Sequence, residues 1–173
     1  MHPQPIKGEY AVGIFTALPV ERASVWQQGP LEVVEATIGA AGTTGLRVIA
    51  AHPEAPVNAK AFRRWREQLG ELRGVLDEAT GATIVIGDLN SGTLQPPYER
   101  LLTSRFRDAH DILGTALRPS WGVAPWFPRW VPTLLARLDH LIVSDEVTVV
   151  SLEDLDAVGS DHRPFRAHLH LRA

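Results

Sequence analysis

Polar side chains that can do chemistry follow four separate apolar segments of the sequence. They are His52, Asp88 with Asn90, Asp139, and Asp161 with His162. Strand ends hold side chains in fixed geometry toward solvent, so active sites are often built there. Carboxylates and an amide suit a hard divalent cation, and a carboxylate beside an imidazole makes a proton-transfer pair. The set therefore favours one metal-assisted site.

Each residue also has an ordinary explanation when it is taken alone. An aspartate after a strand, such as Asp88, usually caps a turn. A histidine in the position of His52 is more often a turn or surface residue. Asp139 is harder to dismiss, because a carboxylate among apolar strand residues needs a partner. The combination, rather than any single residue, carries the hypothesis.

The elements that must position these residues are strands interleaved with one long helix, which indicates the α/β (α+β) class. Strands are predicted over residues 10–18, 31–38, 45–52, 83–87, 138–144 and 164–171, with 148–155 as a further candidate. An amphipathic helix is predicted from residue 58 or 59 to about 80, and a short helix from the Pro-Pro pair at 96–97 to 102. Residues 113–132, rich in Trp and Pro, read as an ordered loop.

Composition restricts the class of protein further. The chain of 173 residues is 45% hydrophobic and fits a single domain over residues 1–173. Its net charge of −3 argues against a protein that coats nucleic acid non-specifically. The absence of cysteine excludes disulfides, thiolate zinc sites and cysteine nucleophiles. No signal-like or membrane-spanning stretch is evident, so a soluble chain is expected, and its compartment stays open.

Four short strings of sequence resemble the motifs of one family, in that family's order. IGDLN at 86–90 resembles GD(F/L)N, RLDH at 137–140 resembles R(I/L)D(Y/H), GSDHRP at 159–164 resembles the terminal SDHxP, and AHP at 51–53 resembles a strand-end histidine. From about residue 13 to the end, the chain thus resembles the endonuclease/exonuclease/phosphatase superfamily, which includes DNase I-like and exonuclease III-like nucleases.

The resemblance implies a four-layer α-β-β-α sandwich and a metal-dependent phosphoesterase, by default a nuclease. Asp88 and Asn90 would orient the attacking water and contact the phosphate. His162, paired with Asp139, would be a general base or a phosphate-stabilising cation. His52 would donate to a phosphate oxygen or protonate the leaving group. The metal ion, Mg²⁺ or Mn²⁺, would be held by Asp161 and Asp88. The substrate would be a phosphodiester or phosphomonoester, with DNA or RNA as the default and phospholipid head groups or small phosphoesters as the alternatives.

The sequence departs from the family at its beginning. The family's early asparagine and its metal-binding glutamate have no match, and residues 13–19 resemble a later strand instead. We therefore expect an N-terminally truncated version of the fold, in which a partner chain or a second copy covers the missing region. The alternative function is a non-catalytic remnant or a phosphate-binding module.

Other polar and aromatic residues are left with structural roles as the first expectation. Trp121, Trp126 and Trp130 either stack on substrate bases or, more simply, pack their loop onto the core. His168 and His170 are expected at the surface of the last strand. His110 and Asp111 are expected in a loop. The arginines of the long helix, at 63, 64, 66 and 73, are expected to face solvent.

Overall fold

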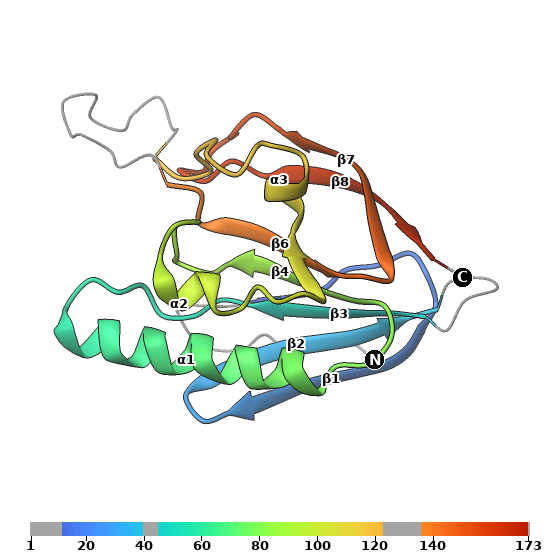
Figure 1. The fold of residues 1–173 in the computed structure, drawn as a ribbon, viewed down its shortest axis with the longest axis horizontal. Coiled ribbons are helices and arrows are strands. Elements are labelled where there is room, and N and C mark those ends of the chain that lie inside the picture. The colour runs from blue at the N-terminus through green and yellow to red at the C-terminus, as the bar shows by residue number, and fades with distance from the viewer. Residues whose placement is uncertain (1–11, 40–44, 123–135, 173) are drawn as a thin grey trace.

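The computed structural model describes residues 12–39, 45–122 and 136–172, which form a mixed α/β fold (Figure 1). The strands are β1 (Val20–Gln28), β2 (Leu31–Ile38), β3 (Leu46–Ala51), β4 (Thr83–Asp88), β5 (Phe106–Asp108), β6 (Asp139–Ser144), β7 (Val147–Asp154) and β8 (Phe165–Leu171). The helices are α1 (Ala59–Glu78), α2 (Pro96–Glu99) and α3 (Ala109–Ile112).

Six of the strands form one mixed sheet in the order β1-β2-β3-β4-β6-β5. Only β3 and β4 are parallel within it, and α1 connects them. This parallel pair brings the ends of β3 and β4, which carry two of the candidate residues, to the same edge of the sheet. The strands β7 and β8 form a separate antiparallel pair.

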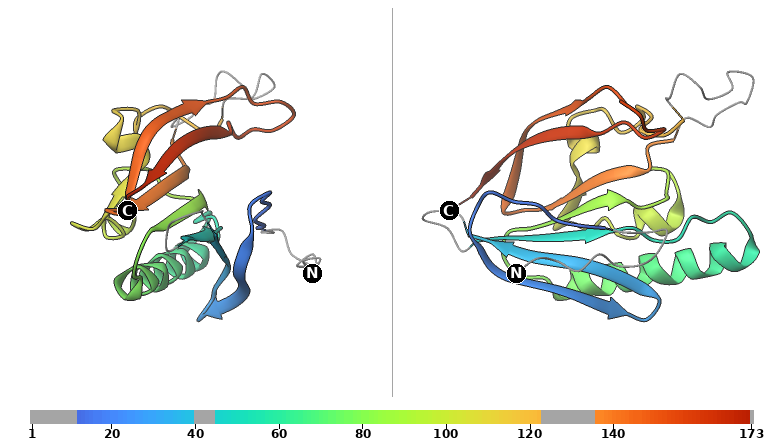
Figure 2. Two further views of the ribbon diagram at one scale, coloured as in Figure 1. Left: turned by 90° about the vertical axis from the view of Figure 1, so that its right-hand side faces the viewer. Right: turned by 180° about the vertical axis from the view of Figure 1, so that it is seen from behind.

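The alternation of side chains along the central strands divides the core between two faces of the sheet. Val85 and Ile142 pack with α1, whereas their neighbours Ile84, Leu141 and Val143 pack with apolar residues of β7 and β8. Figure 2 shows α1 and the β7–β8 pair on opposite sides of the large sheet. The described residues thus form three layers: helix, six-stranded sheet and two-stranded sheet.

Helix α1 begins and ends where its sequence predicts. Asn58 is the N-cap, and its side-chain oxygen accepts hydrogen bonds from the backbone N–H groups of Lys60 and Ala61. Trp65, Leu69 and Leu72 lie on its buried face. The helix ends before Gly81, which takes a positive φ of 71°.

The prediction of a first strand over residues 10–18 was wrong. Residues 12–18 form no strand, residues 10 and 11 lie outside the described part, and the first strand is β1, directly after Pro19. β1 is an edge strand with neighbours on one side only, and much of its apolar surface is exposed, including Val20 and Val25. Its sequence therefore lacks a hydrophobic alternation that would reveal it. The short elements β5 and α3 were also missed.

No helix in the described ranges combines the length and the apolar character that a membrane crossing requires.

Gly87 is the position on β4 where a side chain is least tolerable. Its φ is 152°, and an added Cβ would lie 2.1 Å from the carbonyl oxygen of Ala51. We expect Gly87→Ala to destabilise the protein by about 2 kcal/mol or more, because strand β3 must move. Gly74→Ala, in α1 with open space around it, should instead stabilise by about 0.5–1 kcal/mol. Urea unfolding of both variants would test the difference, and equal midpoints would contradict it.

Candidate functional site

Asp88 and Asp139 lie side by side on neighbouring strands. The two residues are directly paired in the antiparallel register of β4 and β6. By strand alternation, Asp88 shares the face of Ile84 and Ile86, which packs toward β7 and β8. The two carboxylates therefore stand at one end of the sheet, on the side of the second sheet.

His162 joins this pair from the segment between β7 and β8. Its Nδ1 lies 2.8 Å from Asp139 Oδ2. The hydrogen bond to Asp139 raises the pKa of His162 above its ordinary value, against the opposing effect of partial burial, and the charge of Asp88 adds to the rise. With Nδ1 engaged by the carboxylate, the ring presents Nε2 to Asp88.

Asp88 Oδ2 faces two imidazoles at distances longer than a hydrogen bond. His52 Nε2 lies 3.6 Å from it and His162 Nε2 lies 3.7 Å from it. The other carboxylate oxygen accepts a hydrogen bond of 2.8 Å from the Asn90 N–H. Burial raises the pKa of Asp88, and the negative charge of Asp139 adds to this, while Asn90 and the two histidines act in the opposite direction.

Asn90 is placed beside these groups by a strained turn. Its φ is +49°, in the left-handed region that asparagine tolerates better than most residues. Its side-chain Nδ2 donates to the carbonyl of Pro53 at 2.9 Å, which ties the end of β4 to the segment after β3. The indole of Trp65 donates to the carbonyl of Leu89 at 3.1 Å, so α1 also holds this turn.

Asp161 lies next to His162 but has a different partner. Its Oδ2 accepts a hydrogen bond of 3.1 Å from the indole Nε1 of Trp121. Trp121 and His162 also form an isolated β-bridge, so these contacts fix the segment that carries the histidine. Trp126 and Trp130 lie outside the described residues.

The structure therefore brings His52, Asp88, Asp139 and His162 together, with Asn90 in contact with Asp88. Among the described residues, Asp88, Asp139 and His162 offer ligand atoms that all lie within 4.8 Å of one another and could hold a metal ion. Two adjacent carboxylates, one with a raised pKa, are a donor set whose repulsion a divalent cation would relieve. Asp161, predicted as a metal ligand, is not a member of this group of three.

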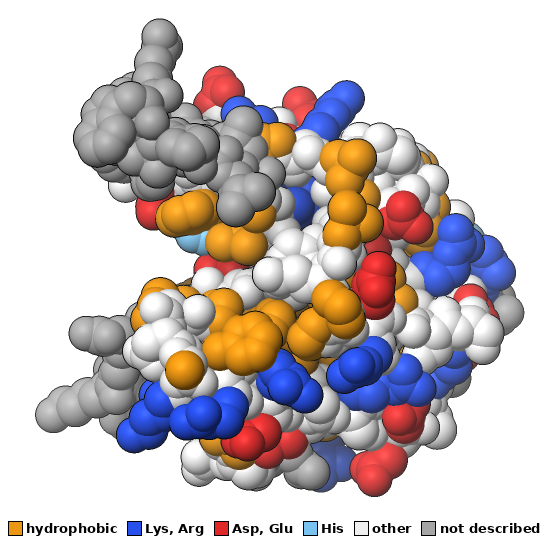
Figure 3. Space-filling model, turned by 60° about the vertical axis from the view of Figure 1, so that its left-hand side comes forward, with side chains coloured by type: hydrophobic (Ala, Val, Ile, Leu, Met, Phe, Trp, Pro, Cys, Tyr) orange, Lys and Arg blue, Asp and Glu red, His pale blue; other side chains and the backbone are white. Residues whose placement is uncertain are grey.

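The four side chains are partly exposed, at 24% for His52, 18% for Asp88, 20% for Asp139 and 28% for His162. Figure 3 shows a hollow in the molecular surface with histidine and acidic side chains at its floor and hydrophobic side chains along its borders. A substrate could thus reach the cluster from solvent.

Ser120 is a supporting residue that the sequence did not reveal. It is fully buried, and its Oγ accepts hydrogen bonds from the N–H groups of Leu138 and Asp139, at 2.9 and 3.1 Å. Its carbonyl accepts from the N–H of Arg163 at 2.6 Å. Ser120 thereby links the strand of Asp139 to the segment of His162. A serine in a loop carries no signal that would have identified it.

A second missed feature is a buried polar cluster behind the site, made of Tyr98, Asp108, His110 and His140. Asp108 accepts hydrogen bonds from the Tyr98 hydroxyl and the His110 N–H, and lies 2.9 Å from His140 Nδ1. His140 Nε2 lies 2.8 Å from the carbonyl of Ser91, next to Asn90. The expected loop at His110 is instead the short helix α3, and His110 is buried. His168 and His170 are exposed, as predicted.

The chain matches the family model described as the endonuclease/exonuclease/phosphatase family over residues 2–162. A search among proteins with curated descriptions found no match. Several solved structures are similar in fold. An endonuclease/exonuclease/phosphatase from Beutenbergia cavernae is 22% identical, with a TM-score of 0.61, over 82% of this chain and 40% of its own.

Two further structures are similar at lower sequence identity. A mannosyl-6-phosphatase from Bacteroides thetaiotaomicron is 16% identical, with a TM-score of 0.62, over 88% of this chain and 67% of its own. D. rerio TDP2, in complex with a single strand DNA product, is 16% identical, with a TM-score of 0.65, over 87% of this chain and 68% of its own.

At these identities the structural similarity shows the fold alone, and the chain spans 40% and 56% of the first two structures it matches. The family rests on the sequence model, which covers most of the chain. This protein belongs to the endonuclease/exonuclease/phosphatase family.

Proposed function

We propose that this protein hydrolyses phosphate esters, and phosphodiesters in particular, with the help of a divalent cation. The observation that carries the proposal is the contact between His162 and Asp139, which leaves His162 Nε2 facing the carboxylate of Asp88. A base oriented by one carboxylate, opposite a second carboxylate and a second histidine, is suited to hydrolysis of a bound ester.

In the proposed reaction, His162 is the general base. Its Nε2 takes a proton from a water molecule as the water oxygen forms a bond to phosphorus. Asp139 accepts the Nδ1 hydrogen bond, which fixes the tautomer and stabilises the imidazolium that forms. Asp88 and Asn90 orient the water and contact the phosphate.

His52 completes the proton balance. As the bond between phosphorus and the leaving oxygen breaks, His52 Nε2 donates a proton to that oxygen. His52 Nε2 lies 3.6 Å from Asp88 Oδ2, the same carboxylate oxygen that His162 Nε2 faces. The proposed roles of the five residues thus need no group from outside the cluster for proton transfer.

Asp88 is the proposed metal ligand with the strongest support, because its neighbour Asp139 and its raised pKa both favour a cation there. When bound, Mg²⁺ or Mn²⁺ would neutralise charge that develops on the phosphate oxygens. Asp161 remains a proposed ligand, and it would have to share its oxygen with the Trp121 indole.

We also propose that the 173 residues form one domain, which corresponds to the part of a four-layer α-β-β-α sandwich that carries these motifs. The similar structures are longer than this chain, and the second sheet has two strands in the described residues. Apolar side chains near β1 are exposed, such as Phe15 at 93% and Leu18 at 58%. Further strands, from a partner chain or a second copy, would cover such a surface.

The similar structures include a sugar phosphatase and a protein bound to DNA, so they do not decide the substrate. We propose nucleic acid as the substrate class. An alternative function is phosphate binding without turnover, favoured by the engagement of Asp161 with Trp121, which leaves two carboxylates in the cluster of three.

The purified chain should hydrolyse bis-p-nitrophenyl phosphate, a diester, faster than p-nitrophenyl phosphate, a monoester. Hydrolysis should require Mg²⁺ or Mn²⁺, stop with EDTA, and be absent in an Asp88→Ala/His162→Ala double variant. If the folded protein binds phosphate but releases no nitrophenol with either ester, the alternative function replaces the proposed one.

A further inference from the structure

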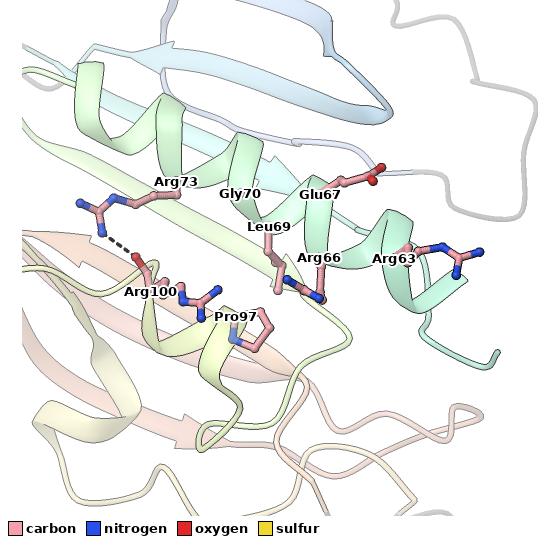
Figure 4. Close-up of a pocket in the computed structure, with 8 residues that line it drawn as sticks. All are labelled: Arg63, Arg66, Glu67, Leu69, Gly70, Arg73, Pro97 and Arg100. Carbon is pink, nitrogen blue, oxygen red and sulfur yellow. Dashed lines mark hydrogen bonds between the residues drawn. The ribbon is translucent and has the colours of Figure 1, made fainter. Parts of the chain in front are cut away.

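A second hollow lies between α1 and α2, and arginine side chains surround it. Its volume is about 360 Å³. Figure 4 shows Leu69 and Pro97 between the two helices with Arg66 beside them, Arg73 and Arg100 at one end, and Arg63 at the other end. The charged residues that line it are Arg63, Arg66, Arg73, Arg100 and Glu67. We call this hollow the α1–α2 groove.

The α1–α2 groove concentrates positive charge in a protein whose net charge is −3. Four of its five charged side chains are arginines, and Glu67 offsets one of them. Arg73 is engaged already, since it pairs with Asp77 at 2.8 Å and donates to the Arg100 carbonyl.

The other three arginines, Arg63, Arg66 and Arg100, are exposed and form no ion pair within the described ranges. Arginine recognises phosphate through a planar fork of donors, which makes phosphate the ligand class that fits best.

The arrangement along α1 is that of a track rather than a point site. Arg63 and Arg66 lie three residues apart on one side of α1, and Arg100 follows α2 on the other side of the groove. A single phosphate group would use one or two of these side chains. A chain of phosphates, as in a nucleic acid backbone, would use the whole length.

An exposed aromatic ring beside the arginines favours a single strand. Phe62 is 42% exposed, and the guanidinium of Arg66 lies 6.0 Å from the centre of its ring. Unpaired bases stack on exposed aromatic rings, while arginines follow the backbone, in proteins that bind single-stranded nucleic acid. A membrane surface, by contrast, would meet a convex face more readily than a groove between two helices.

A hydrogen bond links helix α1, which lines the groove, to the turn that carries Asn90 of the candidate site. Trp65, between Arg63 and Arg66, donates its indole hydrogen to the carbonyl of Leu89, directly before Asn90. Figure 3 shows Lys and Arg side chains beyond the hydrophobic patch that borders the hollow of the site. A strand that leaves the hollow across this patch would therefore meet positively charged side chains.

We infer that the α1–α2 groove binds the phosphate backbone of a single-stranded nucleic acid that extends from the site. The inference rests on the proposed function, because it makes the substrate a polynucleotide whose flanking phosphates the arginines hold.

The test compares two triple variants that both change the net charge from −3 to −6. One is Arg63→Gln/Arg66→Gln/Arg100→Gln, and the matched control is Arg22→Gln/Arg107→Gln/Arg166→Gln, exposed positions outside the groove. Binding of a fluorescent single-stranded oligodeoxynucleotide is measured in EDTA, so that no cleavage occurs. Circular dichroism checks that both variants fold.

We expect the groove variant to weaken binding at least tenfold. Its slope of log affinity against log salt should fall by about 2, since each phosphate contact of a single strand contributes about 0.7. The control should bind within twofold of the unaltered protein. Equal weakening in both variants, or no weakening in the groove variant, would overturn the inference. So would a groove-dependent affinity for anionic phospholipid vesicles without one for the oligonucleotide.

Hydrolysis of bis-p-nitrophenyl phosphate by the unaltered protein, measured in parallel, separates the two claims. If this ester is hydrolysed but the oligonucleotide does not bind, the groove inference fails and the proposed function stands. If the oligonucleotide binds through the groove but the ester is not hydrolysed, the groove binds nucleic acid and the proposed hydrolysis fails.

Discussion

Replacing Asp139 with asparagine should lower kcat for bis-p-nitrophenyl phosphate by a factor of about 10² to 10⁴. The carboxylate accepts a hydrogen bond from His162 Nδ1, with 2.8 Å between nitrogen and oxygen, and thereby turns the basic Nε2 toward Asp88. An asparagine can present its NH₂ group to the ring, which favours the wrong tautomer. The substrate would still bind, so KM should change less than kcat.

The same variant should move the acid limb of the pH–rate profile to lower pH. His162 must be neutral to act as a base, and its hydrogen bond with Asp139 raises its pKa above the ordinary 6.5. The activity of the unaltered protein should therefore fall as pH drops through a value above 6.5. Without the carboxylate that pKa falls, and the pKa of Asp88, raised in part by Asp139, falls with it.

Asp145→Asn, at an exposed position after β6, is the matched control and should leave both kcat and the limb unchanged. A loss of kcat in Asp139→Asn without any movement of the acid limb would mean that His162 is not the base. If activity instead rises as the pH falls, the result would favour the role of His162 as a phosphate-stabilising cation.

Removal of the buried Asp108 carboxylate should cause the largest loss of stability. Asp108→Ala leaves the Tyr98 hydroxyl, the His110 N–H and the His140 ring without their acceptor, all inside the protein. Each buried polar group left without a partner costs about 1–3 kcal/mol, so the total loss should be several kcal/mol. Urea unfolding should show this loss, or the variant should fail to fold.

Two comparisons make that result specific. Asp77→Ala removes a partly exposed carboxylate that pairs with Arg73 on α1, and should cost at most about 0.5 kcal/mol. Asp108→Asn keeps the shape of the side chain and should be less destabilised than Asp108→Ala. If Asp108→Ala unfolds at the same urea concentration as Asp77→Ala, the buried cluster does not stabilise the fold.

The cluster also predicts the direction of acid unfolding. Burial alone would raise the pKa of Asp108, but hydrogen bonds from His110 and His140 outweigh it and hold the pKa well below the ordinary value. The unfolded state therefore binds a proton more readily than the folded state. Stability from this group is complete above about pH 3.9 and is lost as the pH falls below it. Asp108→Asn should flatten this part of the stability profile.

Much of the fold was predictable because the buried central elements have regular spacing of apolar residues. The predicted strand at 31–38 coincides with β2, and the helix predicted from residue 58 or 59 to about 80 corresponds to α1 at 59–78. β1 escaped because it lies at an edge with Val20 and Val25 exposed. β5 and α3 escaped because elements of three and four residues carry no periodicity.

The candidate site shows the same contrast between residues that local sequence patterns reveal and residues that they do not. Four site residues were predictable because they lie at the end of a strand or inside a recognisable string of sequence. They are His52, Asp88, Asp139 and His162, and the structure brings them together. Ser120 and Asp108 were invisible because their partners are distant in sequence and meet them only in the folded chain. The roles of the site residues, and the part of Asp161 in metal binding, stay predictions.

The most direct test of a single metal-dependent site is a Mn²⁺ titration of bis-p-nitrophenyl phosphate hydrolysis, by the unaltered protein and by Asp88→Asn. The unaltered protein should show no activity without metal and a saturating rise with Mn²⁺. Asp88→Asn should need at least tenfold more Mn²⁺ for half-maximal activity, because it loses a ligand charge that Asp139 and the histidines cannot replace. Activity in EDTA, or the same Mn²⁺ dependence in both proteins, would contradict the account.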